Sequence, residues 1–205
     1  MESKESGKIL AEVSARHIHL CQEDLEALFG QGYELKKKKE LSLPGMFAAK
    51  ETVEVVCKDC TASAKQERRL DKVRIVGPVR EYTQFEISLS ESRKFGERPL
   101  VRLSGDLEGT PGFKIIGKRG ILKKDKGLII AKRHIHASLR EAEKLGLKHG
   151  QEVAVVLGRQ GERELIFKKV TVRVAEDYRL VFHIDTDEGN AAGVKSRAWG
   201  RILKK

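Results

Sequence analysis

The sequence predicts a mostly β protein with an internal duplication and a few short helices, of the kind that folds as barrels or sandwiches. Two observations lead to this prediction. Many short segments alternate polar and apolar residues or are rich in β-branched residues, and turn signals such as Pro44-Gly45, Gly105-Asp106 and Gly161-Glu162 separate them. In addition, an apolar strand followed by Arg-His-Ile-His, a short helix and a glycine occurs twice along the chain.

The expected strands outside the two histidine motifs alternate or run in β-branched residues. They are "ETVEVVC" at 51–57, "KVRIVGPV" at 72–79, "TQFEISLS" at 83–90, "EVAVVLG" at 152–158, "ELIFKKVTVRV" at 164–174 and "RLVFHID" at 179–185. Each is a length that suits a strand in a small sheet or barrel. No regular alternation of strands with long helices is present, which argues against a parallel α/β sheet.

The first copy of the repeated arrangement reads "KILAEVSARHIHLCQEDLEALFGQGYEL". Its apolar start predicts a strand that leads into the histidine motif. A short helix should follow, because Leu25, Leu28 and Phe29 recur at helical spacing and so fall on one face. Gly30 is expected to end this helix.

The second copy reads "GLIIAKRHIHASLREAEKLGLKHGQEVAVV" and follows the same order. Ser138 is a good helix N-cap, and Leu139, Ala142 and Leu145 fall on one helical face. Gly146 is expected to end the helix. One short repeat could arise by chance, but a strand, motif, helix and glycine in the same order indicate a duplication.

The composition suits a folded protein that is not secreted. The chain has 205 residues, which is long enough for one large domain or two small ones. Hydrophobic residues make up 40% of it and only four residues are proline, so a packed core is feasible. No apolar run reaches the roughly 20 residues of a membrane span, and the N-terminus lacks the apolar segment of a secretory signal. The three cysteines fit a reducing compartment. We therefore expect a cytoplasmic protein without membrane association.

The net charge of +11 limits the classes of partner. A basic excess suits nucleic acid, a membrane surface or an anionic small substrate. Aromatic residues make up only 5% of the chain, and no strip of alternating basic and aromatic residues of the kind that stacks bases is visible. Nucleic acid is therefore not the expected partner.

Four of the six histidines lie in the two Arg-His-Ile-His motifs. Residues i and i+2 of a strand point to the same side, so His17 and His19 should project together, and so should His134 and His136. Two imidazoles one step apart can bind one metal ion such as zinc. The alternative is that each pair packs beneath a helix and is inert; because the arrangement is duplicated, metal binding is the favoured interpretation.

Each histidine pair supplies only two ligands, whereas zinc sites use three or four. His183, which follows an apolar strand and opens a polar loop, is the best third ligand for one pair. Glu86 is a further candidate, but from spacing alone it could equally be a solvated strand glutamate. His149 is interpreted as an exposed turn residue.

Several other residues admit a chemical interpretation that the sequence alone does not favour. Cys57 and Cys60 form a single C-x-x-C motif, which without a second pair is better explained as a turn with two thiols than as a zinc site. Cys21 should begin the first helix. Arg74 and Arg80 carry the planar fork that suits phosphate, although surface salt bridges are the ordinary alternative.

Taken together, seven segments resemble the phosphate propanoyltransferases, the PduL-type phosphotransacylases, in the same order. They are "VSARHIHL", "LSLPGMFAAKETV", "VRIVGPVREYTQFEIS", "VRLSGD" with "GTPG", "IIAKRHIHA", "LGLKHGQEV" and "HIDTDEGNAA". The resemblance extends from residue 8 to about residue 195. The paired Arg-His-Ile-His motifs combined with "HIDTDEGNAA" make it specific.

The resemblance implies two tandem β-barrels capped by short α-helices, with two zinc ions per chain. The N-terminal strand would complete a barrel built mainly from the C-terminal half, so residues 1–15 and 132–205 would form the first barrel. Residues 16–131 would form the second barrel with a lid-like insertion. The implied reaction converts acyl-CoA and phosphate into acyl phosphate and coenzyme A, reversibly, with a propanoyl or acetyl group.

The resemblance also assigns roles to individual residues. His17, His19 and Glu86 match the ligands of one zinc ion, and His134, His136 and His183 match those of the other. Arg80 matches the arginine that holds phosphate. The residues that match the coenzyme A site are Ser14, Lys39, Arg74 and Asn190.

These assignments suggest a direct attack of phosphate, held by zinc and Arg80, on the thioester. The expected partners are acyl-CoA, coenzyme A and inorganic phosphate, without nucleic acid or membrane, and a homodimer is the family-based expectation. Only about eight polar residues precede the first strand, so targeting to a microcompartment is not expected. The alternative function is a zinc-stabilised basic module that binds RNA or another anionic partner.

Overall fold

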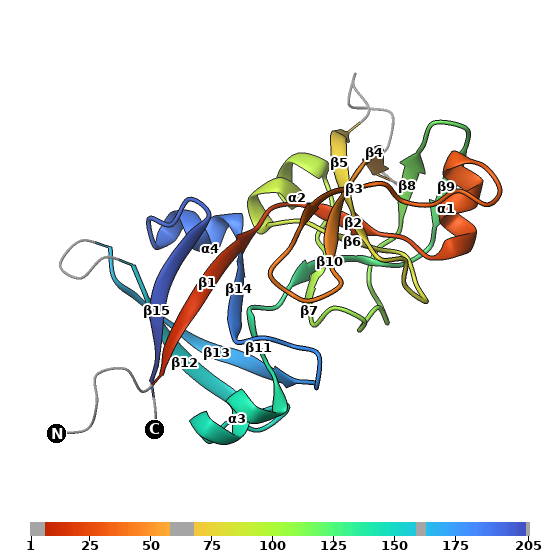
Figure 1. The fold of residues 1–205 in the computed structure, drawn as a ribbon. Helices are drawn as coiled ribbons and strands as arrows, with labels where there is room; N and C mark the ends of the chain where they lie inside the picture. The colour runs from red at the N-terminus through yellow and green to blue at the C-terminus, as the bar shows by residue number, and fades with distance from the viewer. Residues whose placement is uncertain (1–6, 58–67, 159–162, 204–205) are drawn as a thin grey trace, which may run out of the picture. The chain divides into compact units, whose positions relative to one another are not determined.

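The computed structural model describes residues 7–57, 68–158 and 163–203, and strands predominate throughout. The chain separates into two compact units (Figure 1). Unit 1 consists of Met1–Ala15, Ser42–Pro44 and Lys132–Lys205, and unit 2 of Arg16–Leu41 and Gly45–Ala131. Within the described residues no helix is long and apolar enough to cross a membrane. Cys60 and the Gly161-Glu162 turn lie outside these ranges.

Unit 1 contains a closed six-stranded barrel with the strand order β1-β14-β11-β13-β12-β15. Its elements are β1 (Lys8–Ser14), β11 (His134–Ala137), α3 (Leu139–Leu145), β12 (Glu152–Leu157), β13 (Leu165–Val174), β14 (Val181–Asp185), α4 (Thr186–Ala191) and β15 (Arg197–Leu203). The N-terminal strand β1 lies between the C-terminal strands β14 and β15 (Figure 1). Residues from the two ends of the sequence therefore close one barrel.

Unit 2 contains a nine-stranded sheet in which eight strands follow the order β7-β10-β6-β2-β5-β4-β8-β9 and β3 pairs with β4. Its elements are β2 (His17–His19), α1 (Gln22–Phe29), β3 (Lys37–Glu40), β4 (Phe47–Cys57), β5 (Arg69–Gly77), β6 (Gln84–Glu86), α2 (Leu89–Phe95), β7 (Leu100–Arg102), β8 (Phe113–Ile116), β9 (Ile121–Lys124) and β10 (Leu128–Ala131). The predicted fold class is confirmed: strands predominate, a closed barrel is present, and the helices are short.

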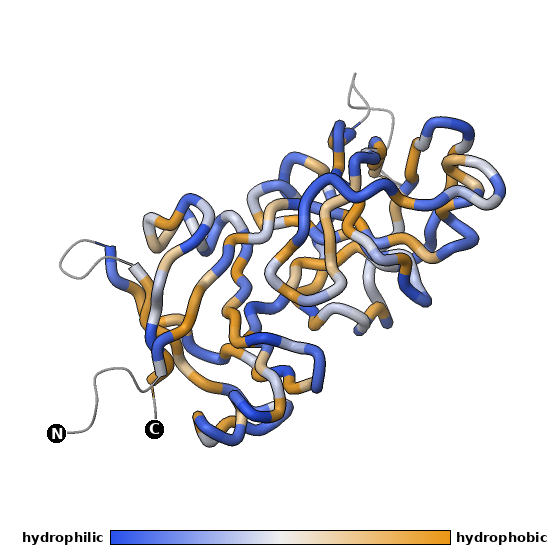
Figure 2. Tube along the Cα trace, in the orientation of Figure 1, coloured by the Kyte–Doolittle hydropathy of each residue, from blue (hydrophilic) through white to orange (hydrophobic). Residues whose placement is uncertain are grey.

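Each unit has its own apolar core, and the middle residue of each histidine motif belongs to it. Ile18 is fully buried in the core of unit 2, and Ile135 is fully buried in the core of unit 1. Figure 2 shows hydrophobic stretches along strands such as β1 and β14 and hydrophilic stretches along many connections. Replacing either isoleucine by alanine should cost about 2–5 kcal/mol of stability. In each motif the isoleucine side chain therefore points into the core, and the two histidine side chains point to the opposite side of the strand.

The two histidine strands have equivalent neighbours. Strand β2 pairs antiparallel with β6 and parallel with β5, and β11 pairs antiparallel with β14 and parallel with β13. In each unit the strand that carries the third residue also pairs in parallel with one more strand: β14 pairs with β1, and β6 pairs with β10. In the chain, β1 directly precedes β2, and β10 directly precedes β11. The duplication seen in the sequence therefore includes the strands on both sides of each motif.

The helices of the two copies form as predicted, with one correction. Leu25, Leu28 and Phe29 are buried on α1, and Cys21 is its N-cap residue. On α3 the sequence predicts Leu139 on the same face as Ala142, which is buried, but the Leu139 side chain is 59% exposed. Helical side chains point toward the N-terminus, so that of the first residue projects off the helix end and misses the core.

Two further helices lie where the sequence predicted part of a strand and a polar loop. The expected strand "TQFEISLS" ends at Glu86, and Ser88 then caps α2. The expected polar loop after His183 is the helix α4, capped by Asp185. Both helices begin with a capping box, in which the cap and a glutamate three residues later satisfy each other's backbone N–H groups. A Ser or Asp followed three residues later by Glu is therefore the sequence pattern that could have predicted both helices.

Candidate functional site

Two groups of side chains in the described residues could each hold a metal ion, one group in each unit. Unit 2 brings together His17, His19 and Glu86, and unit 1 brings together His134, His136 and His183. In each group the atoms able to coordinate an ion lie within 4.8 Å of one another. The two histidines of each motif thus project to the same side, as the strand period predicted.

Both groups are assembled by the same register between strands. His17 lies opposite Glu86 in the β2–β6 pair, and His134 lies opposite His183 in the β11–β14 pair. The third residue of each group therefore occupies an equivalent position, although one is a carboxylate and the other an imidazole.

In unit 2 the carboxylate of Glu86 faces both imidazoles. Its Oε2 lies 3.6 Å from His17 Nε2, and its Oε1 lies 3.9 Å from His19 Nε2. The Nδ1 atom of His19 is 2.9 Å from the carbonyl oxygen of Val76, which orients its Nε2 toward Glu86. Burial lowers the pKa of His19 well below the ordinary value, and the neighbouring charges of His17 and Arg80 lower it further.

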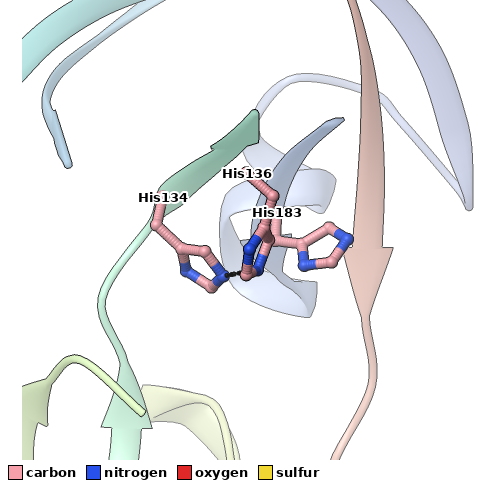
Figure 3. A group of neighbouring side chains, drawn as sticks. All are labelled: His134, His136 and His183. Carbon is pink, nitrogen blue, oxygen red and sulfur yellow. Dashed lines mark hydrogen bonds between the residues drawn. The ribbon is translucent and has the colours of Figure 1, made fainter. Parts of the chain in front are cut away.

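In unit 1 the three imidazoles converge without a carboxylate among them (Figure 3). The Nε2 atoms of His134 and His136 are 2.9 Å apart, and His134 Nδ1 lies 2.8 Å from the carbonyl oxygen of Lys132. Burial lowers the pKa of His134 to about 3, and the charge of His183 acts in the same direction. The imidazole is therefore neutral at physiological pH, which is the form that binds a metal.

The donor sets fit zinc in both units. Zinc binds neutral histidine nitrogen and carboxylate oxygen, and three protein ligands leave a coordination position for a substrate. Carbonyl groups of the backbone hold the outer nitrogens of His19 and His134, as is usual for metal-binding histidines. Burial keeps both rings in the unprotonated form.

Arg80 is linked to the unit 2 group through two polar side chains that sequence reasoning missed. Arg80 Nη1 donates to Ser104 Oγ at 2.9 Å, and the same oxygen accepts from Gln84 Nε2 at 2.8 Å. Gln84 also donates to Glu86 Oε1 at 2.5 Å, and its own Oε1 accepts from the N–H of Gly105 at 2.8 Å. Gln84 is fully buried, so this chain of contacts fixes the position of Glu86 relative to Arg80.

The residues expected at the coenzyme A site are divided between the units. Ser14 ends β1 and Asn190 lies on α4, both in unit 1, where Ser14 is paired in register with the α4 cap residue Asp185. Lys39 is exposed on β3 of unit 2. Arg74 lies on β5 opposite His17 and donates from Nη1 to the carbonyl oxygens of residues 49–51.

The arginines that begin the two motifs have equivalent partners. Arg16 Nη1 lies 2.6 Å from Glu91 Oε1, and Arg133 Nε lies 3.2 Å from Glu188 Oε1. Both glutamates belong to capping boxes, those of α2 and α4, and each lies five residues beyond the third member of its metal group. Burial raises the pKa of Glu188 even though the charge of Arg133 opposes it. Each arginine therefore ties its histidine strand to the helix that follows the third candidate ligand.

The chain is similar to one family of enzymes along nearly its whole length. The phosphate propanoyltransferase family model matches residues 10–195. The phosphate propanoyltransferase of Thermotoga maritima is 53% identical over 189 residues, which is 92% of this chain and 85% of that protein. Those of Leptotrichia buccalis and Lachnoclostridium phytofermentans are each 43% identical, over 95% of this chain and 88% of each relative.

Proposed function

The chain belongs to the phosphate propanoyltransferase family and is an acyltransferase, and from that premise we propose that it interconverts acyl-CoA and phosphate with acyl phosphate and coenzyme A. The observation that carries the proposal is the pair of histidine groups built on one register, with Arg80 connected to one of them. The alternative prediction, an RNA-binding module, gains no support from the family comparisons.

We propose that His17, His19 and Glu86 hold one zinc ion and that His134, His136 and His183 hold a second. Zinc, when bound, would act as a Lewis acid toward phosphate, the thioester carbonyl and the departing thiolate. The protein's part is to supply neutral imidazoles in fixed directions. The buried environment and the carbonyl contacts of His19 and His134 do this.

In the proposed reaction an oxygen of bound phosphate attacks the thioester carbonyl carbon. A carbon–oxygen bond forms, the carbon–sulfur bond breaks, and coenzyme A leaves as a thiolate that takes up a proton from solvent. Arg80 is the residue that would hold phosphate, because its guanidinium can donate two parallel hydrogen bonds to phosphate oxygens. Phosphate already carries negatively charged oxygens at neutral pH, so the attack does not call for a general base.

The substrates follow from this reaction. Acyl-CoA, coenzyme A and phosphate are anionic and match the net charge of +11. Ser14, Lys39, Arg74 and Asn190 are the residues proposed to contact coenzyme A. A propanoyl group is the acyl group in the name of the family, and acetyl is the competing choice. One methylene is worth only about 1–3 kcal/mol in an apolar pocket, so measured rates with acetyl-, propanoyl- and butyryl-CoA decide the preference.

The proposed activity is tested by mixing the zinc-loaded protein with propanoyl-CoA and phosphate and following thiol release. Release should require phosphate and should produce propanoyl phosphate. Release without phosphate would indicate a hydrolase, and no release from protein that contains zinc would exclude the proposed reaction. Exchange of labelled coenzyme A into acyl-CoA without phosphate would instead indicate an acyl-cysteine intermediate.

A further inference from the structure

A carboxylate outside both metal groups lies against the unit 1 group. Glu12 is on β1, opposite His183 in the parallel β1–β14 pair. Its Oε2 lies 3.6 Å from His183 Nε2, and the two side chains are 15% and 18% exposed. A small movement of either side chain would bring Glu12 Oε2 and His183 Nε2 within hydrogen-bonding distance, and both side chains are largely shielded from water.

The other oxygen of Glu12 is held in place by two side chains of the same unit. Its Oε1 accepts from Arg197 Nε at 2.7 Å and from the hydroxyl of Ser42. Arg197 Nη2 in turn donates to Ser42 Oγ at 2.9 Å. This triangle fixes the carboxylate plane and leaves Oε2 directed at His183.

The position of Glu12 determines which nitrogen of His183 faces the other two histidines. Because Nε2 faces the carboxylate, Nδ1 is turned toward His134 and His136, and Figure 3 shows one ring nitrogen on each side. A carboxylate accepts a hydrogen bond from Nε2–H, so it favours the tautomer with the proton on Nε2 and the lone pair on Nδ1. His134 is presented in the opposite way, since its Nδ1 lies against the carbonyl oxygen of Lys132.

The equivalent position in unit 2 is apolar. Strand β10 pairs with β6 as β1 pairs with β14, and Ile129 lies opposite Glu86 as Glu12 lies opposite His183. Unit 2 has a carboxylate within the group and isoleucine beside it. Unit 1 has imidazole within the group and a carboxylate beside it. At this pair of facing positions each unit thus places one carboxylate, but on opposite strands.

We propose that Glu12 is a positioning residue, which fixes the Nε2–H tautomer and the ring orientation of His183 so that the three imidazoles bind a divalent zinc ion tightly. The proposal rests on the metal assignment made under the proposed function. Partners of this kind, which contact a ligand but not the metal, typically contribute about 10- to 100-fold to metal affinity.

The variant that tests the proposal is Glu12→Gln. Its amide oxygen can keep the contacts with Arg197 and Ser42, which places the amide NH2 toward His183 Nε2. That donor favours the tautomer with the proton on Nδ1, the nitrogen that should bind the ion. The matched control is Glu164→Gln, which removes one negative charge from an exposed position of unit 1.

The first measurement is a zinc titration against a chromogenic chelator. The wild-type and Glu164→Gln proteins should bind two ions with the same two affinities. Glu12→Gln should weaken one of the two sites about 10- to 100-fold and leave the other unchanged. Equal affinities in Glu12→Gln and wild type would overturn the proposal.

The second measurement is the nitrogen-15 NMR spectrum of the His183 ring in metal-free protein at mildly alkaline pH. The wild type should carry its proton on Nε2, and Glu12→Gln should shift the proton to Nδ1. A wild-type ring with its proton on Nδ1 would overturn the proposal without any variant. If the wild type bound no zinc, the metal assignment would fail, while the tautomer would still decide whether Glu12 orients His183.

Discussion

The two units contain equivalent strand arrangements but different sets of candidate metal ligands. In both, a histidine strand meets a third candidate ligand at one register position, and an arginine joins that strand to the capping box of the next helix. The third candidate ligand is Glu86 in unit 2 and His183 in unit 1, where the carboxylate of Glu12 lies one strand away. One backbone framework therefore holds either two imidazoles with a carboxylate or three imidazoles.

The largest expected effect comes from removing one ligand at a time. His17→Ala and His134→Ala should each lower the zinc content from two ions to one and reduce phosphate-dependent thiol release by at least about 100-fold. Zinc content by elemental analysis and the thiol assay measure both effects. His17→Ala should keep the ion of unit 1, and His134→Ala should keep the ion of unit 2. Because only the unit 2 group contains a carboxylate, the affinities of these two remaining ions should differ. Identical affinities would contradict the asymmetry between the units.

The second effect concerns Arg80, which Ser104 and Gln84 link to the unit 2 group. Arg80→Lys keeps the charge but loses the planar fork, so thiol release should fall roughly 10- to 100-fold, as expected for lost charge-assisted hydrogen bonds. Zinc content should stay at two ions. The control is Arg179→Lys, an exposed position in unit 1, which should keep full activity. An unchanged rate in Arg80→Lys would remove this residue from phosphate binding.

The third effect is a dependence of stability on pH in the metal-free protein. The folded-state pKa of His134 is about 3, far below the ordinary value of 6.5. The unfolded chain therefore binds a proton as the pH falls below about 6.5, and the folded chain does not. Stability is fully present above that pH and should fall by up to about 1.4 kcal/mol per pH unit below it for this residue.

Urea unfolding of the metal-free protein at several pH values between 7 and 5 measures this slope. His134→Asn removes this titrating ring and should make the dependence of stability on pH less steep. A slope that is the same in wild type and His134→Asn would contradict the buried neutral state of His134.

The smallest effect concerns the two arginine–glutamate pairs. Arg16 and Arg133 are more than a third exposed, so each pair should contribute only about 0.5–1 kcal/mol. Double-mutant cycles with Arg16→Gln and Glu91→Gln, and with Arg133→Gln and Glu188→Gln, measure the two coupling energies. Similar values would support the structural equivalence of the units, and a large coupling in one unit alone would break it.

The local features of the fold were predictable from the sequence. The two histidine motifs, their strand conformation, the buried isoleucines between the histidines and the helices α1 and α3 follow from periods of two and 3.6 residues. The helices α2 and α4 were missed because their capping-box spacing was read as part of a strand and a loop. Leu139 was misplaced because the first residue of a short helix does not reach its core face.

The candidate site was predictable only in part for a different reason. Spacing identified the histidine pairs and made His183 and Glu86 candidate third ligands, whereas only the family resemblance assigned each candidate to its own pair. Gln84, Ser104 and Glu12 carried no signal at all, because each acts through contacts with residues that are distant in sequence. Ordinary polar residues on strands look the same in sequence whether they face solvent or a ligand.

The sequence by itself therefore determined which side chains project together, because the direction of side chains along a strand is a local property of the backbone. The tertiary structure decided which distant strands became neighbours and in which register, and thereby which third residue completes each group. Register between strands is set by long-range pairing and burial, and a slip of one residue would turn Glu86 or His183 to the other face of its strand. The placement of Glu12 beside His183 is a consequence of the same pairing.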